Sequence, residues 1–216
     1  MIDYEQTAIK ATKKNFPEVI INGCYFHFGQ CLWRNLQSQG LQAWYREVEN
    51  AFLIKQIQAL AFAPPEDVCS LFNDFVQSLD LQTDEILSDF LAYFETTWLG
   101  IIQGRRRRRP TFDIGMWSVY NLMKDNLPRT NNSVEGWHHA FNKRVLVWHP
   151  TVTKLLRKLR KEQASVELQT EQASMGIDIS RKNERYNRIN ERLKKIVAEY
   201  NREDGIDFLK AIAHNI

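Results

Sequence analysis

Residues 68–94 read VCSLFNDFVQSLDLQTDEILSDFLAYF and decide the fold class. From Val68 to Leu79, apolar side chains recur at i, i+3, i+4, i+7 and i+11, which is the spacing of one helix face. The same spacing returns from Ile86 to Phe94. We therefore predict two amphipathic helices in this stretch.

Helical signals extend in both directions from this stretch. Glycine and proline number only 9 and 6 among the 216 residues, and this shortage of turn residues favours long helices. We also expect Val152, Leu155, Leu156 and Leu159 to be buried in a long basic helix whose N-cap is Thr151. The predicted helices lie over 4–15, 26–39, 41–63, 84–99, 117–124, from about 133, from Thr151, over 180–201 and over 207–213.

The β signal is confined to the beginning of the chain. Met1-Ile2 and the β-branched run Val19-Ile20-Ile21 stand on either side of the helix predicted over 4–15. A strand, a helix and a second strand in this order predict a right-handed parallel βαβ unit. The expected fold class is therefore mostly α, with two short parallel strands.

Composition excludes several classes of protein. No run approaches the ~20 apolar residues of a membrane span, so we expect no membrane partner. The beginning of the chain is acidic where a signal peptide would be basic. Three cysteines cannot all pair, which argues against a secreted disulfide scaffold. We expect a nuclear or cytoplasmic protein.

Charge is unevenly distributed along the chain. Residues 1–100 contain 6 Lys/Arg and 13 Asp/Glu, a net charge of −7, whereas residues 101–216 have a net charge of +10. This asymmetry fits a polyanion that binds one face of the protein. A solvated helical surface is the alternative, and charge alone leaves both open.

Three short motifs could carry chemistry. Asp3 ends the first predicted strand and could hold a divalent metal or cap the next helix. Cys24-x2-His27 has the spacing of half a zinc site, although a buried Cys beside a hydrogen-bonded His is the commoner outcome. Asn131-Asn132-x-x-Glu135 also fits a capping box.

In combination, these motifs resemble the Mutator-like element transposases, and more narrowly the transposase domain found in animal proteins with FLYWCH-type zinc fingers. The resemblance covers most of residues 1–160. The matching residues are Asp3-Tyr4-Glu5, Phe16-Pro17, Gly23-Cys24-Tyr25-Phe26-His27-Phe28, Gly40-Leu41, Ala59-Leu60-Ala61-Phe62-Ala63-Pro64, Arg109-Pro110, Phe112, Trp117, Arg129 to Asn132, Glu135 to His138, and His149-Pro150.

The resemblance implies an RNase H-like catalytic domain in which Asp, Asp and Glu hold two divalent metals, Mg²⁺ or Mn²⁺. By this resemblance Asp3 matches the second Asp and Glu135 matches the Glu, with Cys24 and His27 as a structural pair that could take zinc. Two such metals, ~3.5–4 Å apart, activate the attacking oxygen and stabilise the leaving oxygen in phosphodiester chemistry.

The family's first Asp lies on an earlier strand that has no counterpart in these residues. We therefore expect a C-terminal part of a transposase, with a truncated RNase H-like remnant, that is inactive alone. The expected domains are the core remnant over 1–40, a helical insertion ending in an Arg-rich linker over 41–110, a return to the catalytic core over 111–172, and a C-terminal helical extension over 173–216.

The resemblance also implies DNA as the partner, namely transposon ends, with a homodimer left open and no small-molecule substrate. A run of arginines can neutralise phosphates, although a solvated linker or a nuclear-localisation signal explains it equally well. The alternative function is a non-catalytic helical DNA-binding or protein-interaction fragment derived from a transposable element. The expected DNA-contacting residues are Arg105, Arg106, Arg107, Arg108, Arg109, Arg129, Lys143 and Arg144.

Overall fold

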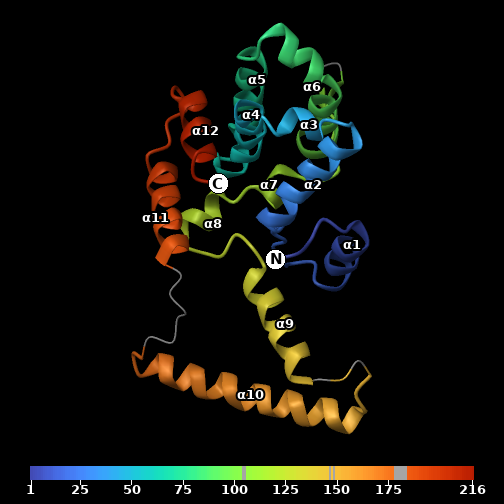
Figure 1. Ribbon diagram of the computed structural model, residues 1–216, viewed down its shortest axis with the longest axis vertical. Coiled ribbons are helices and arrows are strands. Elements are labelled where there is room, and N and C mark those ends of the chain that lie inside the picture. Colours follow the sequence, from blue (N-terminus) through green and yellow to red (C-terminus); the bar gives the residue numbers. More distant parts are fainter. Residues whose placement is uncertain (104–105, 146, 148, 178–183) are drawn as a thin grey trace. The chain divides into compact units, whose positions relative to one another are not determined.

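A computed structural model describes residues 1–103, 106–145, 147, 149–177 and 184–216 (Figure 1). The chain divides into two compact units. Unit 1 comprises residues 1–130 and 188–216, and unit 2 comprises residues 131–187. Each unit is described by itself below.

Helices dominate both units, which confirms the prediction of a mostly α fold. Among the described helices, none is long and apolar enough to cross a membrane. In chain order the elements are α1 (Gln6–Asn15), α2 (Tyr25–Ser38), α3 (Gln42–Tyr45), α4 (Val48–Ala59), the 3₁₀ turn η1 (Leu60–Phe62), α5 (Val68–Gln77), α6 (Leu81–Phe94), the π-helical turn η2 (Glu95–Leu99), β1 (Ile102–Gln103), β2 (Arg106–Arg107), α7 (Ile114–Trp117), α8 (Tyr120–Lys124), α9 (Asn132–Val145), α10 (Val152–Ser174), α11 (Glu184–Ala198) and α12 (Gly205–Ala213).

Two helix ends follow directly from the sequence. Gly40 adopts φ = 75° after the end of α2, which is the left-handed conformation that glycine accepts most easily. Its N–H donates to the Gln37 carbonyl at 3.1 Å, and the Leu41 N–H donates to the Leu36 carbonyl at 3.0 Å. This is a Schellman motif. At the other end of a helix, the predicted N-cap Thr151 accepts from the Lys154 N–H at 3.3 Å.

The helix predicted over 41–63 is instead three pieces, α3, α4 and η1. The break after α3 is stabilised by Asn50, whose side-chain amide donates to the Trp44 carbonyl at 2.9 Å. That carbonyl therefore has a partner outside a continuous helix. Hydrophobic spacing does not detect such a break, because both pieces keep their apolar sides toward the same core.

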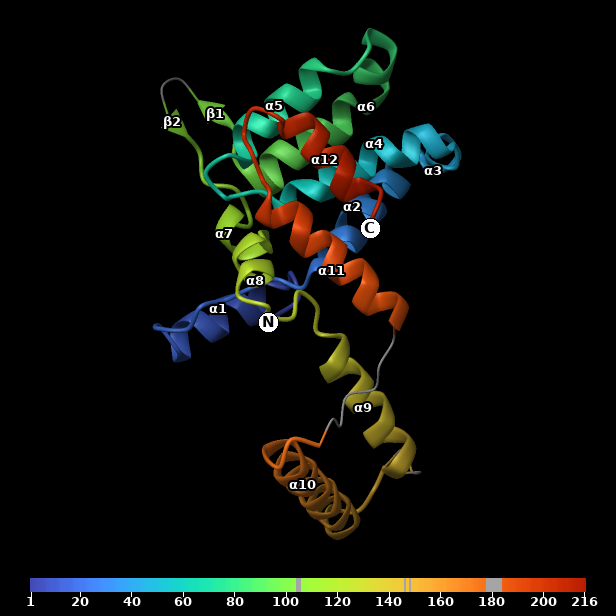
Figure 2. The same ribbon diagram turned by 90° about the vertical axis from the view of Figure 1, so that its left-hand side faces the viewer.

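The core of unit 1 is a bundle in which α12 packs on α4 and α5, and α2 packs on α4 and α6 (Figure 2). The stripe predicted in residues 68–79 forms the α5 side of this core, since Val68, Leu71 and Phe75 are fully buried. On α6, Leu87, Phe90 and Phe94 are also fully buried, whereas Ile86 remains exposed.

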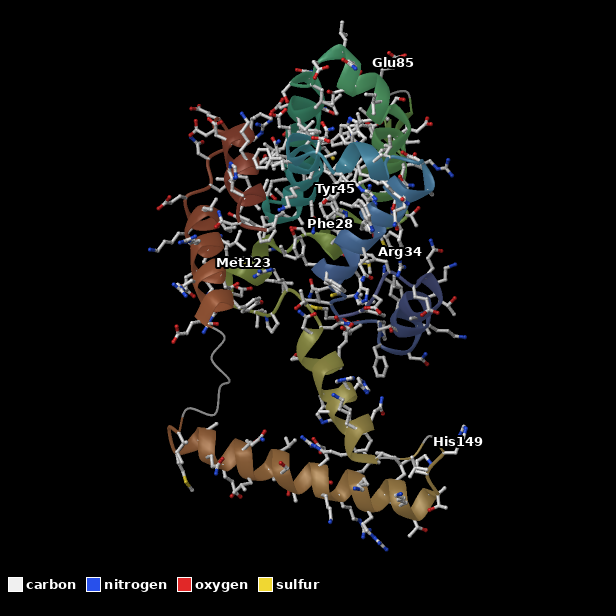
Figure 3. The ribbon with its side chains drawn as sticks, viewed as in Figure 1. Phe28, Arg34, Tyr45, Glu85, Met123 and His149 are labelled. Carbon is white, nitrogen blue, oxygen red and sulfur yellow. The ribbon has the colours of Figure 1, made fainter. Side chains whose placement is uncertain are left out.

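Phe28 occupies the centre of an aromatic cluster in this core (Figure 3). Its ring stacks on Trp117 with centroids 5.0 Å apart and meets the edge of Trp98 at 4.9 Å. The Trp117 indole N–H donates to the Trp98 carbonyl at 3.0 Å. Offset and edge-to-face contacts are the favourable arrangements of aromatic pairs, so the cluster fixes α2, η2 and α7 against one another.

The end of the chain returns to α5 through polar contacts. The Tyr200 hydroxyl donates to Asp67 Oδ2 at 2.8 Å. Arg202 Nη2 lies 2.6 Å from Asp74 Oδ2, and its Nε donates to Ser70 Oγ at 3.1 Å. These contacts hold the segment between α11 and α12 against α5 within unit 1.

The predicted strand Val19-Ile20-Ile21 is wrong in its position. Ile2 forms a parallel bridge with Gly23, because its N–H donates to the Asn22 carbonyl and its carbonyl accepts from the Cys24 N–H, both at 2.9 Å. Residues 19–21 lie outside this pairing, and Ile20 is 83% exposed. The parallel pairing across α1 is thus present only as an isolated bridge, two residues beyond the end of the predicted strand.

In unit 2, α9 packs against the 23-residue helix α10. The predicted burial along α10 is wrong: Val152, Leu156 and Leu159 are 72%, 52% and 38% exposed, and Leu155 is half-buried. The reason is geometric, since the face of α10 that lies toward α9 includes Lys158 and Glu162 and not these apolar residues. The predicted helix start at Ser180 lies outside the described residues.

We expect the substitution Phe28→Ala to lower the free energy of unfolding by about 3–5 kcal/mol, because it leaves a cavity between two tryptophans. Urea denaturation followed by circular dichroism measures the change. Phe26→Ala is the matched control on the same helix, at a side chain that is 47% exposed, and should cost less than about 1 kcal/mol. Equal losses in the two variants would contradict this description of the core.

Candidate functional site

Three consecutive backbone amides at the beginning of α2 bind three distant parts of the chain. Such amides have no partner within their own helix and must find one elsewhere. The bonds are Gly23 N–H to the Met116 carbonyl at 2.7 Å, Cys24 N–H to the Ile2 carbonyl at 2.9 Å and Tyr25 N–H to the Arg129 carbonyl at 2.9 Å. The start of α2 therefore brings together three segments of the chain, which it binds at Ile2, Met116 and Arg129.

Asp3 and His27 come together at this helix start. Asp3 follows Ile2 directly, and His27 is the third residue of α2. Their side chains meet with His27 Nδ1 3.0 Å from Asp3 Oδ1, and they are 21% and 52% exposed, respectively. The structure thus joins two of the predicted site residues in one half-exposed polar pair.

Tyr4, the residue directly after Asp3, is fixed in the core by its aromatic ring, a role that the sequence did not indicate. Its ring lies 4.9 Å from Trp98 and 5.1 Å from Phe112, both in edge-to-face contact. Burial raises the pKa of the Tyr4 hydroxyl far above its usual value, so the group stays neutral. A Cβ at Gly23 would collide with this hydroxyl. The available signal was an aromatic residue next to Asp3 and a glycine next to Cys24.

Cys24 is the N-cap residue of α2 and is fully buried. Structural zinc usually takes four ligands, and no group of three His, Cys, Asp or Glu side chains placed to hold a metal occurs among the described residues. Cys24 and His27 are two of the four ligands that a structural zinc site would take. Asp3 offers a different donor, since a half-exposed carboxylate oxygen is a ligand that Mg²⁺ or Mn²⁺ accepts.

Glu135 belongs to unit 2, in the first turn of α9. Its N–H donates to the Asn131 carbonyl at 3.0 Å, and so does that of Val134 at 2.9 Å. The helix therefore begins at the doubled asparagine, as the motif predicts. The Glu135 side chain is exposed. Asp3 lies in unit 1, so the two predicted metal ligands are described in separate units.

Arg129 must be removed from the predicted DNA-contacting set. Its side chain is only 9% exposed, and its Nη1 donates to Asn190 Oδ1 at 2.5 Å. Its guanidinium also lies over the Phe62 ring at 5.9 Å. A guanidinium held in this way joins α11 to the rest of unit 1 and is not presented to phosphates.

Arg106–Arg107 form strand β2 of the β1–β2 hairpin (Figure 2). Arg107 pairs with Ile102 in the antiparallel register, and its Nη1 donates to the Gly100 carbonyl at 2.5 Å. Arg107, Arg108 and Arg109 are exposed. Arg105 lies outside the described residues, and of Arg106 only the backbone is described.

Of the two predicted cations at the end of α9, one is already paired. Arg144 forms an ion pair with Glu162 of α10, and the Trp137 indole N–H donates to the other oxygen of the same carboxylate at 3.1 Å. Lys143 is exposed in the last turn of α9. The predicted cations thus differ in what they can offer to a polyanion.

No protein-family model, curated protein or solved structure matches the chain. The candidate site is therefore defined by its own geometry: a half-exposed Asp–His pair on the α2 helix start, and an exposed arginine edge on the hairpin.

The substitution Arg129→Ala should lower the free energy of unfolding by about 2–4 kcal/mol, since it removes a buried hydrogen-bonded cation and leaves Asn190 without it. DNA affinity at fixed salt should change less than about twofold. Chemical denaturation and fluorescence anisotropy measure the two quantities. Arg192→Ala, at an exposed position of α11, is the control and should leave both unchanged. A large loss of DNA affinity with unchanged stability would restore Arg129 to the DNA-contacting set.

Proposed function

We propose that this chain is the C-terminal part of a Mutator-like DDE transposase. The observation that carries the proposal is the meeting of three motif segments at the start of α2. Two of its amides bind the Ile2 carbonyl, directly before Asp3, and the Arg129 carbonyl, directly before Thr130-Asn131-Asn132. Cys24 and His27 of the third motif belong to the helix start itself.

This convergence is hard to explain as unrelated capping. The Asn131 motif lies more than a hundred residues from the other two, and a capping role for each motif would need only its own following helix. A two-metal nuclease, by contrast, needs carboxylates brought together from distant segments. Arg129, whose carbonyl binds the start of α2, comes two residues before the Asn131-Asn132-x-x-Glu135 motif in the sequence. The parallel bridge across α1 further supports an RNase H-like remnant in residues 1–40.

In the complete enzyme, Asp3 and Glu135 would be ligands for Mg²⁺ or Mn²⁺, which would activate the attacking oxygen and stabilise the leaving one. In this chain, His27 holds one oxygen of Asp3 and so orients the carboxylate. Tyr4 fixes the backbone next to it through its buried ring. The family's first Asp has no counterpart among these 216 residues, so we expect no strand transfer by this polypeptide alone.

The exposed arginines of the hairpin would contact DNA. Arg107, Arg108 and Arg109 are consecutive, and alternate residues of an extended segment point to opposite sides. An edge of this kind can reach phosphates on a duplex without reading base sequence. A DNA partner favours the nucleus over the cytoplasm among the two expected locations.

The double substitution Asp3→Asn/Glu135→Gln should weaken Mn²⁺ binding by about tenfold or more, because carboxylate charge sets the affinity of a hard cation. Electron paramagnetic resonance of free Mn²⁺ measures it. Asp89→Asn/Glu85→Gln removes the same charge from exposed positions of α6 (Figure 3) and should leave binding unchanged. If both variants bind Mn²⁺ like the natural sequence while DNA binding persists, the non-catalytic DNA-binding alternative replaces this proposal.

Replacing Arg107, Arg108 and Arg109 with alanine should weaken binding to duplex DNA and flatten its salt dependence. Each lost phosphate contact removes about 0.9 from the slope of log K against log salt. Fluorescence anisotropy at several salt concentrations measures both. The triple variant at Lys10, Lys13 and Lys14 removes the same charge from exposed positions of α1. Equal losses in the two variants would show that net charge alone, and not the hairpin, attracts DNA.

A further inference from the structure

Helix α10 presents an apolar seam that its neighbour α9 leaves uncovered. Val152, Leu156, Leu159 and Val166 are 72%, 52%, 38% and 48% exposed. Their spacing alternates between four and three residues when Gln163 is included, and Thr170 and Ala173 continue it. This is the a/d pattern of a coiled coil over three heptads.

The face of α10 that α9 contacts is a different one. The Glu162 carboxylate accepts from Trp137 and pairs with Arg144. The hollow between the two helices is lined by Phe141, Arg144, Lys158, Lys161, Glu162 and Ser165. None of these six is a seam residue, so α9 and the seam occupy separate faces of α10.

Charge is polarised along the same helix. Residues 152–161 contain five cations and no acid, namely Lys154, Arg157, Lys158, Arg160 and Lys161. Residues 162–174 contain three acids and no cation, namely Glu162, Glu167 and Glu171. Two parallel copies of α10 would place like charges together, whereas two antiparallel copies place the basic half of each beside the acidic half of the other.

We propose that α10 pairs with α10 of a second copy of this chain, in antiparallel orientation, along this seam. Arg160 and Glu167 each follow a seam residue, Leu159 and Val166, and so lie on the same flank. In an antiparallel pair, equivalent flanks face each other across the two-fold axis. Arg160 would therefore lie opposite Glu167 of the partner subunit, twice in the dimer, with Gln163 near the axis.

This inference goes beyond the proposed transposase function and does not rest on it. The proposed partner is a second copy of this chain, because the apolar seam and the charge pattern of α10 complement those of another α10 that runs in the opposite direction. A seam with Gln163 and Thr170 among its positions is less apolar than that of a permanent zipper, so the dimer should dissociate on dilution.

Sedimentation equilibrium of the full chain over roughly a hundredfold concentration range tests the proposal, since mass should approach twice 25.5 kDa as concentration rises. Arg160→Glu and Glu167→Arg, made singly, should each raise the dissociation constant about tenfold, because each converts two attractive pairs into two repulsive ones. The two together should restore the natural affinity. Lys154→Glu makes the same charge change on the side of α10 away from the seam, and should change it less than about twofold.

Cross-linking with a short bifunctional thiol reagent tests the orientation. In an antiparallel dimer, Gln163→Cys should cross-link beyond the background of the three natural cysteines. Val152→Cys should not, since the two copies of that position would lie roughly 35 Å apart along the helix axis. A monomer at every concentration would overturn the proposal, and would mean that the seam binds its own chain or another partner. Equal cross-linking at the two positions would also overturn it.

Discussion

The start of α2 is the constraint on which unit 1 depends. Gly23, Cys24 and Tyr25 donate their amides to carbonyls of Met116, Ile2 and Arg129, and all three donors belong to buried residues. A buried amide without a partner costs about 1–3 kcal/mol, so each segment is held where its carbonyl is needed. Asp3 and His27 meet because of this arrangement. Their contact follows from backbone bonds, and the half-exposed side chains contribute little to stability themselves.

The aromatic core behind α2 and the polar contacts at the end of the chain complete the same unit. Phe28 faces the core on the helix whose first residues hold the distant segments. The returning segment binds α5 through Tyr200 and Arg202, and α11 holds Arg129 through Asn190. The residues of unit 2 are inserted between Thr130 and Arg188 of unit 1. Within unit 1, the chain leaves just after Arg129 and returns just before Asn190. The bonds of Arg129 to Tyr25 of α2 and to Asn190 of α11 fix both of these positions.

Sequence periodicity predicted the features that depend on local burial, such as the α5 stripe. Residue type also predicted a feature of local backbone chemistry, namely the N-cap at Thr151. It could not predict which side chain a distant residue contacts. In the sequence Arg129 resembles a phosphate ligand, because its hydrogen-bond partner Asn190 is 61 residues away and no neighbouring residue indicates this contact. The apolar face of α10 predicted burial, but periodicity does not say whether a partner within the chain exists.

The cations of the second half of the chain therefore differ in what surrounds them. Arg129 is buried and Arg144 is paired with Glu162, whereas Arg107, Arg108 and Arg109 are exposed on the hairpin. On α10 the cations are followed along the axis by acids, so that helix is a poor match for a uniformly charged duplex and a good match for a reversed copy of itself. The net charge of this half thus sums two separate features. One is the set of exposed arginines on the hairpin, which suits phosphate, and the other is helix α10, whose two ends differ in the sign of their charge. Under the two proposals above, the hairpin would bind DNA and α10 would bind a second copy of itself.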